Sequence, residues 1–170
     1  MLAAKADVQS VSGAQGIPPV FMAAAGGHAL IIDTLLKAQA DPNQPRWDGM
    51  APLWRACAAG HAAAADTLCR GGAFLEVARD GQTVLQMASA AGHTDVVQTL
   101  LSRKADANAA QADGTTALLL ACEQGHEGPA SALLQAKADP QYACTPSPLI
   151  MAAAHGHDPV VSCLLRRHLL

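Results

Sequence analysis

Residues 85–101 read LQMASAAGHTDVVQTLL and residues 118–134 read LLLACEQGHEGPASALL, with the pair Gly-His at the same place in both. This pair recurs along the chain, and the successive glycines stand 33, 32, 33 and 31 residues apart. A repeat of this length is typical of proteins in which one small structural unit is stacked several times. The five pairs are Gly27 with His28, Gly60 with His61, Gly92 with His93, Gly125 with His126, and Gly156 with His157.

Other residues keep a fixed distance from each motif glycine. The fourth residue before it is alanine in every copy, and an apolar pair begins eight residues after it, as at Leu100 with Leu101. We expect the glycine to end a short first helix by adopting a positive φ, after which the chain returns in a second helix. Pro19, Pro52 and Pro148 are expected in the first turn of a first helix, where the fixed φ of proline suits the helix.

Together these motifs resemble the ankyrin repeat, which has a period of about 33 residues and carries Ala-Ala, Gly-His, Leu-Leu and Gly-Ala-Asp in this order. The resemblance covers nearly the whole chain. It implies an all-α fold, namely an ankyrin-repeat solenoid of stacked helix-turn-helix units with β-hairpin-like finger loops. The pairs Asp48-Gly49, Asp80-Gly81 and Asp113-Gly114 have the turn chemistry expected at the finger tips.

The repeat pattern divides the chain into five repeats within one continuous domain. A partial repeat and a finger loop are expected at 1–15, because residues 2–9 (LAAKADVQ) align with residues 134–141 (LQAKADPQ). Solenoids need polar capping repeats, so an open N-terminal end implies either a piece of a longer protein or a cover from elsewhere. The repeats are expected at 16–48, 49–80, 81–113, 114–144 and, truncated, 145–170.

Two family positions depart from the pattern. The histidine of Thr-Pro-Leu-His is replaced throughout, and two of its substitutes, Phe21 and Trp54, are expected to pack as an aromatic pair inside the array. The glycine of Gly-Ala-Asp is kept only at Gly72. If the other sites keep a positive φ, each non-glycine residue costs about 1 kcal/mol. Those residues are Lys5, Gln39, Lys104 and Lys137.

Composition excludes several classes of function. A net charge of −3 gives no broad positive field, so a nucleic-acid partner is not predicted. No segment qualifies as a direct membrane span. The five cysteines form no CxxC pair, which favours reduced thiols in an intracellular, reducing compartment, cytoplasmic by default with an organelle left open.

Catalytic, cofactor and metal sites are not predicted. Cys57 with His61 and Cys122 with His126 have metal-ligand spacing, but a glycine breaks the helix within each pair and the pairs lie two repeats apart. The repeated aspartates occupy one structural position and are interpreted as loop residues rather than as an acid and base pair. They are Asp7, Asp41, Asp106 and Asp139. We therefore predict a protein that is not an enzyme.

By resemblance to the family, the function lies on the surface. Ankyrin arrays bind proteins through finger tips and the concave helix face, so we expect a protein-protein interaction module, with Trp47 as the anchor of the contact. Two alternatives stay open: a permanent structural subunit of a large assembly, membrane-bound or not, and the targeting arm of a longer enzyme or channel. The candidate contact residues are Arg46, Trp47, Met50, Arg55, Arg79, Gln82, Glu123, Gln124 and His155.

Overall fold

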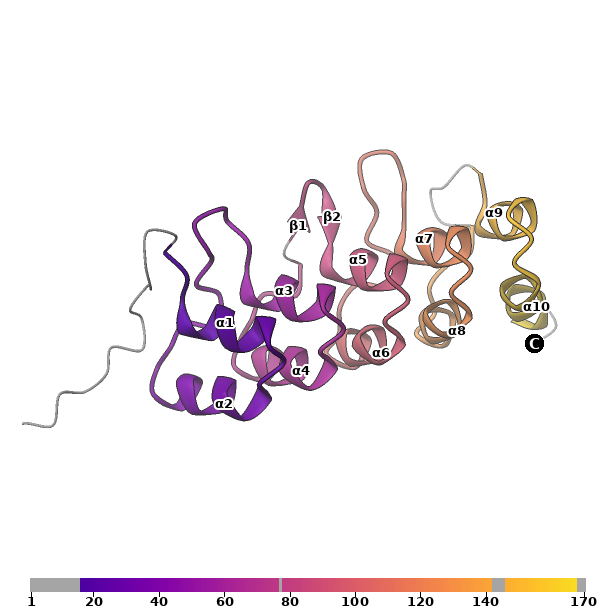
Figure 1. Ribbon diagram of the computed structural model, residues 1–170. Coiled ribbons are helices and arrows are strands. Elements are labelled where there is room, and N and C mark those ends of the chain that lie inside the picture. Colours follow the sequence, from indigo (N-terminus) through magenta and orange to yellow (C-terminus); the bar gives the residue numbers. More distant parts are fainter. Residues whose placement is uncertain (1–15, 77, 142–145, 168–170) are drawn as a thin grey trace, which may run out of the picture. The chain divides into compact units, whose positions relative to one another are not determined.

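A computed structural model describes residues 16–76, 78–141 and 146–167, and the chain forms two compact units that meet in sequence at Phe74 and Leu75. We call them the N-terminal unit and the C-terminal unit. The partial repeat and finger loop predicted at 1–15, with Lys5 and Asp7, lie outside the described residues. Both units consist of paired short helices (Figure 1), as the repeat pattern predicts.

In the N-terminal unit, two helix pairs stack on each other. The first helices of the two repeats pack together, α1 against α3, and so do the second helices, α2 against α4. Four helices are described here: α1 (Pro19–Ala25), α2 (Ala29–Lys37), α3 (Pro52–Ala58) and α4 (Ala62–Arg70).

The C-terminal unit continues the same pattern through three helix pairs. The first helices α5, α7 and α9 form one layer, and the second helices α6, α8 and α10 form the other. A two-stranded antiparallel hairpin, β1 (Ala78–Arg79) with β2 (Gln82–Thr83), precedes α5. The fold class is therefore the predicted all-α repeat with short fingers. The helices are α5 (Val84–Ala90), α6 (Thr94–Ser102), α7 (Ala117–Glu123), α8 (Glu127–Gln135), α9 (Pro148–Ala154) and α10 (Asp158–Arg167).

Helix ends follow from local sequence. Proline occupies the first turn of α1, α3 and α9, as predicted. The first turn of α5 is instead capped by the Thr83 hydroxyl, which accepts a hydrogen bond from the Gln86 N–H while the Gln86 side chain accepts one from the Thr83 N–H. Each motif glycine follows a first helix with φ between 70° and 75°. The predicted left-handed turn is confirmed.

The ring of the motif histidine gives a second reason, besides the positive φ, for glycine at the motif position. In His126 the ring nitrogen Nε2 lies 3.1 Å from the Ala90 carbonyl at the end of the preceding first helix, and in His157 it lies 2.9 Å from the Glu123 carbonyl. A carbonyl can only accept, so the ring donates. A Cβ added at Gly125 would come within 2.6 Å of the His157 ring. The next repeat therefore packs directly on the glycine backbone.

The N-terminal unit has the same contact. His61 Nε2 lies 3.3 Å from the Ala25 carbonyl, and a Cβ at Gly27 would come within 2.8 Å of the His61 ring. One contact thus joins successive repeats in both units. Below it, the leucines of the motif form the core, and those that are fully buried include Leu53, Leu68, Leu85, Leu100, Leu118 and Leu133.

Three of the residues that replace the family histidine are buried, but Phe21 and Trp54 do not pack on each other as predicted. Phe21 and Trp54 both lie in the interior, yet the ring contact recorded for Phe21 is with the guanidinium of Arg46, 5.3 Å from the ring centroid. Gln86 is also buried, and its side-chain amide donates to the carbonyls of Ala109 and Thr115 at 2.8 and 3.0 Å. The substitute side chain therefore ties α5 to the next finger loop.

Three non-glycine residues keep the left-handed conformation after a second helix. The φ values are 69° at Gln39, 72° at Lys104 and 65° at Lys137, and Gly72 has 92° at the equivalent position. Each of the three side chains is accommodated at a strain of about 1 kcal/mol.

Replacing Gly125 by alanine tests the contact between repeats. Gly156 has a similar φ, 72° against 75°, but open space where a Cβ would stand, so Gly156→Ala reports the backbone strain alone. We expect Gly125→Ala to lower the free energy of unfolding by about 1–2 kcal/mol more than Gly156→Ala, because the His157 ring must move. Urea unfolding measures both. In a His157→Ala background the difference should disappear, and equal losses in the original background would contradict the contact.

Lys137→Gly should stabilise the chain. Glycine adopts φ of 65° without strain, and the gain of about 0.5–1 kcal/mol is what remains after the larger entropy of the unfolded chain is subtracted. The control is Ala136→Gly one residue earlier, at an exposed position with φ of −79°, where glycine should destabilise. A shift of both urea midpoints in the same direction would show that backbone strain does not operate at Lys137.

Candidate protein-binding surface

The finger of the N-terminal unit is held rigid by one carboxylate. Asp48 Oδ1 accepts a hydrogen bond from Arg46 Nε at 3.0 Å and another from the Met50 N–H at 3.1 Å, while Oδ2 pairs with the Arg46 Nη2. The backbone closes the turn, because the Arg46 N–H donates to the Met50 carbonyl. The bond with Asp48 raises the pKa of Arg46 above its ordinary value. The tip is thus organised before any partner arrives.

Trp47 stands at this tip and projects outward. Its side chain is 68% exposed, although the Arg46 guanidinium lies 5.9 Å from its ring centroid. The same guanidinium lies over Phe21 of α1, so Arg46 links the finger to the helix layer. An exposed tryptophan on a fixed turn is suited to contact with another protein.

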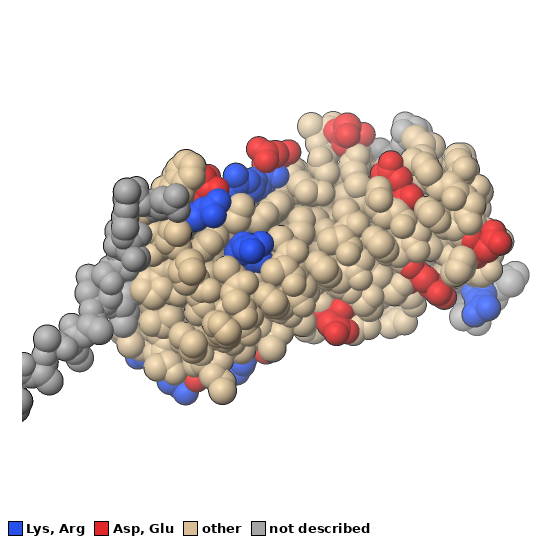
Figure 2. Space-filling model, in the orientation of Figure 1, with Lys and Arg blue, Asp and Glu red and all other residues tan. Residues whose placement is uncertain are grey.

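The first helices of this unit present a face of mostly small residues with little charge. Arg55, Ala58 and Ala59 lie on one side of α3 by their spacing, and all three are partly exposed. Among the described residues, the Arg55 side chain makes no hydrogen bond or ion pair. Most of the surface over α1 is neither acidic nor basic (Figure 2). The structure therefore brings Arg46, Trp47, Met50 and Arg55 into one unit.

The other five candidate residues belong to the C-terminal unit. Arg79 lies in β1, with Nε 3.9 Å from an oxygen of Asp80, and Gln82 follows the turn in β2. At the C-terminal end of α9, the exposed His155 donates from Nδ1 to the Met151 carbonyl at 2.9 Å. Glu123 and Gln124 stand at the end of α7. A binding role for these residues remains a prediction.

Loop aspartates have the structural role that the sequence predicts. The carboxylates of Asp41, Asp106 and Asp139 accept hydrogen bonds from the N–H two residues later at 2.8, 2.9 and 2.8 Å. At the finger tip before α7, the Asp113 carboxylate accepts a hydrogen bond from the Thr115 N–H at 2.9 Å. This bond lowers the pKa of Asp113. These carboxylates hold turns and do not converge on one site.

The two Cys and His pairs are engaged elsewhere. His61 and His126 bond to backbone carbonyls, and burial raises the pKa of the Cys57 thiol far above its ordinary value. Within residues 16–76, 78–141 and 146–167, no three His, Cys, Asp or Glu side chains form a group that could hold a metal ion. In the same ranges, no helix has the length and apolarity needed to cross a membrane.

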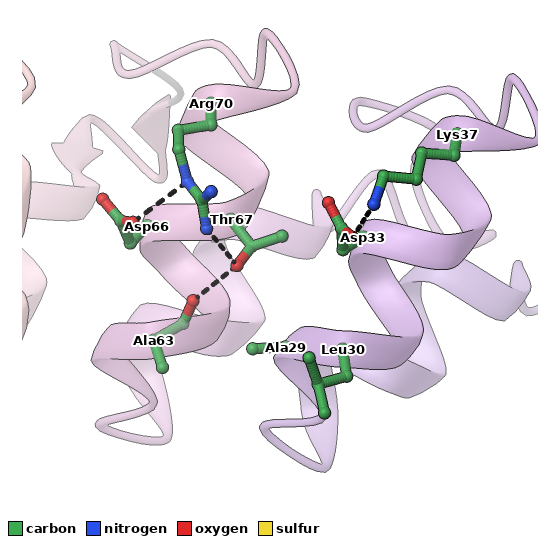
Figure 3. A pocket seen from close by; sticks show the side chains of 8 residues that line it. All are labelled: Ala29, Leu30, Asp33, Lys37, Ala63, Asp66, Thr67 and Arg70. Atoms are coloured by element: carbon green, nitrogen blue, oxygen red, sulfur yellow. Dashed lines mark hydrogen bonds and ion pairs between the residues drawn. The ribbon is translucent and has the colours of Figure 1, made fainter.

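Sequence reasoning missed a groove of about 410 Å³ between α2 and α4. Figure 3 shows two facing rows of side chains, with Leu30 near one end and two ion pairs toward the other. Lys37 pairs with Asp33 at 2.6 Å and Arg70 with Asp66 at 3.2 Å, each within its own helix. The i,i+4 spacing of these charges was the available signal. Because each cation is neutralised locally, the groove has no free charge to capture a ligand.

A comparison with family models identifies the family of the chain. Residues 20–111 and 73–144 match the model described as ankyrin repeats in three copies. A search of curated proteins finds no match.

Proposed function

The chain belongs to the ankyrin repeat family, and we propose that it is a non-enzymatic module that binds a protein partner through its finger loops and the face of its first helices. Ankyrin repeats generally mediate protein-protein interaction. The observation that carries the proposal for this chain is Trp47, which is 68% exposed on a turn that Asp48 holds in place.

The cost of binding is low at such a tip. A partner that covers Trp47 removes a large apolar ring from water, and little loop entropy is lost because the turn is already ordered. Tryptophan is also among the residues that contribute most to measured interfaces. Trp47 is therefore the proposed anchor. The Arg46 guanidinium, which also lies over the Phe21 ring, supports the Trp47 ring.

Charge suggests the chemistry of the partner. Arg46 is already paired with Asp48, so it offers little net charge, whereas Arg55 has no such pair among the described residues. The alanines beside Arg55 let a partner backbone approach closely. The expected partner segment places an apolar side chain near Trp47 and a carboxylate near Arg55.

A permanent structural subunit is the second candidate. The observation that favours it is the apolar surface of α2, where both Leu30 and Ile31 are exposed. A subunit of this kind would be recovered with its neighbours in fixed proportion, whereas an exchangeable module would be recovered partly free. A targeting arm of a longer enzyme or channel remains a third proposal.

Trp47→Ala should weaken partner binding by about 30-fold or more, the factor that corresponds to a loss of 2 kcal/mol at an interface. The partner is first identified by cross-linking the full chain in extracts of its natural source, and affinity is then measured by calorimetry. Phe74→Ala is the matched control, since Phe74 is also 68% exposed but lies in another loop. Equal affinity of Trp47→Ala and the original chain would reject Trp47 as the anchor.

A further inference from the structure

The first helices of the C-terminal unit carry a row of partly exposed apolar side chains. Met87 in α5, Leu120 in α7 and Met151 in α9 each occupy the fourth residue of their helix, and none of the three is fully buried. Within this unit α5 lies beside α7, and α7 lies beside α9 (Figure 1). Because the three residues share one register, their side chains lie on the same side of their helices. We call these three residues the apolar row.

A carboxylate stands beside the apolar row. Glu123 follows Leu120 by one helical turn, so both residues lie on the same side of α7. The equivalents of Glu123 in the neighbouring first helices are the small residues Ala90 and Ala154. Glu123 is partly exposed, and among the described residues its side chain makes no hydrogen bond or ion pair. Its backbone carbonyl accepts a hydrogen bond from His157 Nε2 at 2.9 Å, which fixes the end of α7. The carboxylate is thus held at a defined place and is open to a cation.

The spacing of the apolar row fits an α-helix that lies across α5, α7 and α9. Neighbouring helices pack about 8–10 Å apart, and one heptad of an α-helix rises about 10.5 Å. Such a helix can therefore place one apolar residue of each heptad on each residue of the row. The two methionines of the row suit this contact, because the flexible thioether side chain adapts to apolar groups of different shape.

We propose that the first helices of the C-terminal unit bind a basic amphipathic helix of another protein. The apolar side of that helix covers the apolar row, and a lysine or arginine one turn from its apolar residue pairs with Glu123. This inference rests on the proposed function and specifies the partner segment for one unit. In the N-terminal unit the positions of Leu120 and Glu123 hold Arg55 and Ala58, so the first helices there favour the opposite charge.

The described fingers of the same unit are compatible with a basic partner. Asp113, at the finger tip before α7, is exposed, and its carboxylate accepts a hydrogen bond from a backbone N–H. Arg79, in the finger before α5, has an acid beside it, with Nε 3.9 Å from an oxygen of Asp80. The positive charge of Arg79 is therefore partly balanced and opposes a basic segment only weakly.

Two designed helical peptides, titrated into the full chain, test the proposal. The basic peptide is about three heptads long, with leucine once in each heptad and lysine one turn after each leucine. The acidic peptide has glutamate in place of each lysine. Fluorescence anisotropy of a dye on the peptide measures affinity, and methyl NMR of the chain locates the contact. The basic peptide should bind more tightly than the acidic one and shift the methyl signals of Met87, Leu120 and Met151.

Substitutions at two glutamates separate the proposed ion pair from the net charge of the chain. Glu123→Gln should weaken binding of the basic peptide about two- to fivefold, the range of an exposed ion pair. Glu127→Gln is the matched control, because Glu127 is an exposed carboxylate at the start of α8, in the layer of second helices. This control should leave the affinity unchanged. Glu123→Lys should reverse the preference and favour the acidic peptide. Circular dichroism verifies that all variants keep their helix content.

Three results would overturn the proposal. Unmoved methyl signals of the apolar row at about 1 mM basic peptide would show that the row binds no such helix. Equal binding of the two peptides would show that the face does not select a basic partner. Equal effects of Glu123→Gln and Glu127→Gln would show that Glu123 forms no specific pair. None of these results touches the proposed function, which is rejected separately if the Trp47→Ala chain binds its partner as the original chain does.

Discussion

The close approach of a histidine ring to a bare glycine backbone is the constraint on which this repeat depends. At Gly27, Gly92 and Gly125, the ring of the following repeat fills the space where a Cβ would stand. The same ring donates to a carbonyl that the helix end leaves without an intrahelical partner. A helix of seven residues has little stability of its own, so a contact that both ends it and joins it to its neighbour fixes the spacing of the array.

With the repeat contact fixed, other positions are free to vary. The family histidine position holds Phe21 in one repeat and Gln86 in another, and each substitute stabilises a finger in its own way. Phe21 lies under the guanidinium of Arg46, whereas Gln86 bonds to the carbonyls of the next loop. Both arrangements hold a finger against the helices, and in the N-terminal unit the finger so held carries Trp47. Stability and the proposed recognition therefore use separate residues of the same repeat.

Much of the fold could be predicted because it follows from local backbone chemistry. Proline in the first helical turn, glycine at positive φ and aspartate in a loop turn each require only a few neighbouring residues. The equivalence of Lys104 and Lys137 to Gly72 also followed from the register alone, and both residues have a positive φ.

Contacts between long side chains of different repeats could not be predicted in this way. The sequence suggested a ring pair between Phe21 and Trp54, but the Arg46 side chain takes the place over Phe21 because Asp48 fixes its guanidinium there. The acceptors of the motif histidines and the groove beside Leu30 likewise depend on how successive helices stack. For the binding surface, sequence supplied residue types, while the structure supplied the exposure of Trp47 and the unpaired state of Arg55 within the described residues.

The most direct test of the glycine and histidine contact is nitrogen NMR of the full chain labelled at its histidine rings. The account predicts that His61, His126 and His157 carry the neutral-ring proton on Nε2, with slow exchange of that proton, because it is bonded to a carbonyl. His28 is exposed and provides the internal comparison. Protons on Nδ1 of the three rings, or exchange as fast as at His28, would contradict the contact that the whole arrangement rests on.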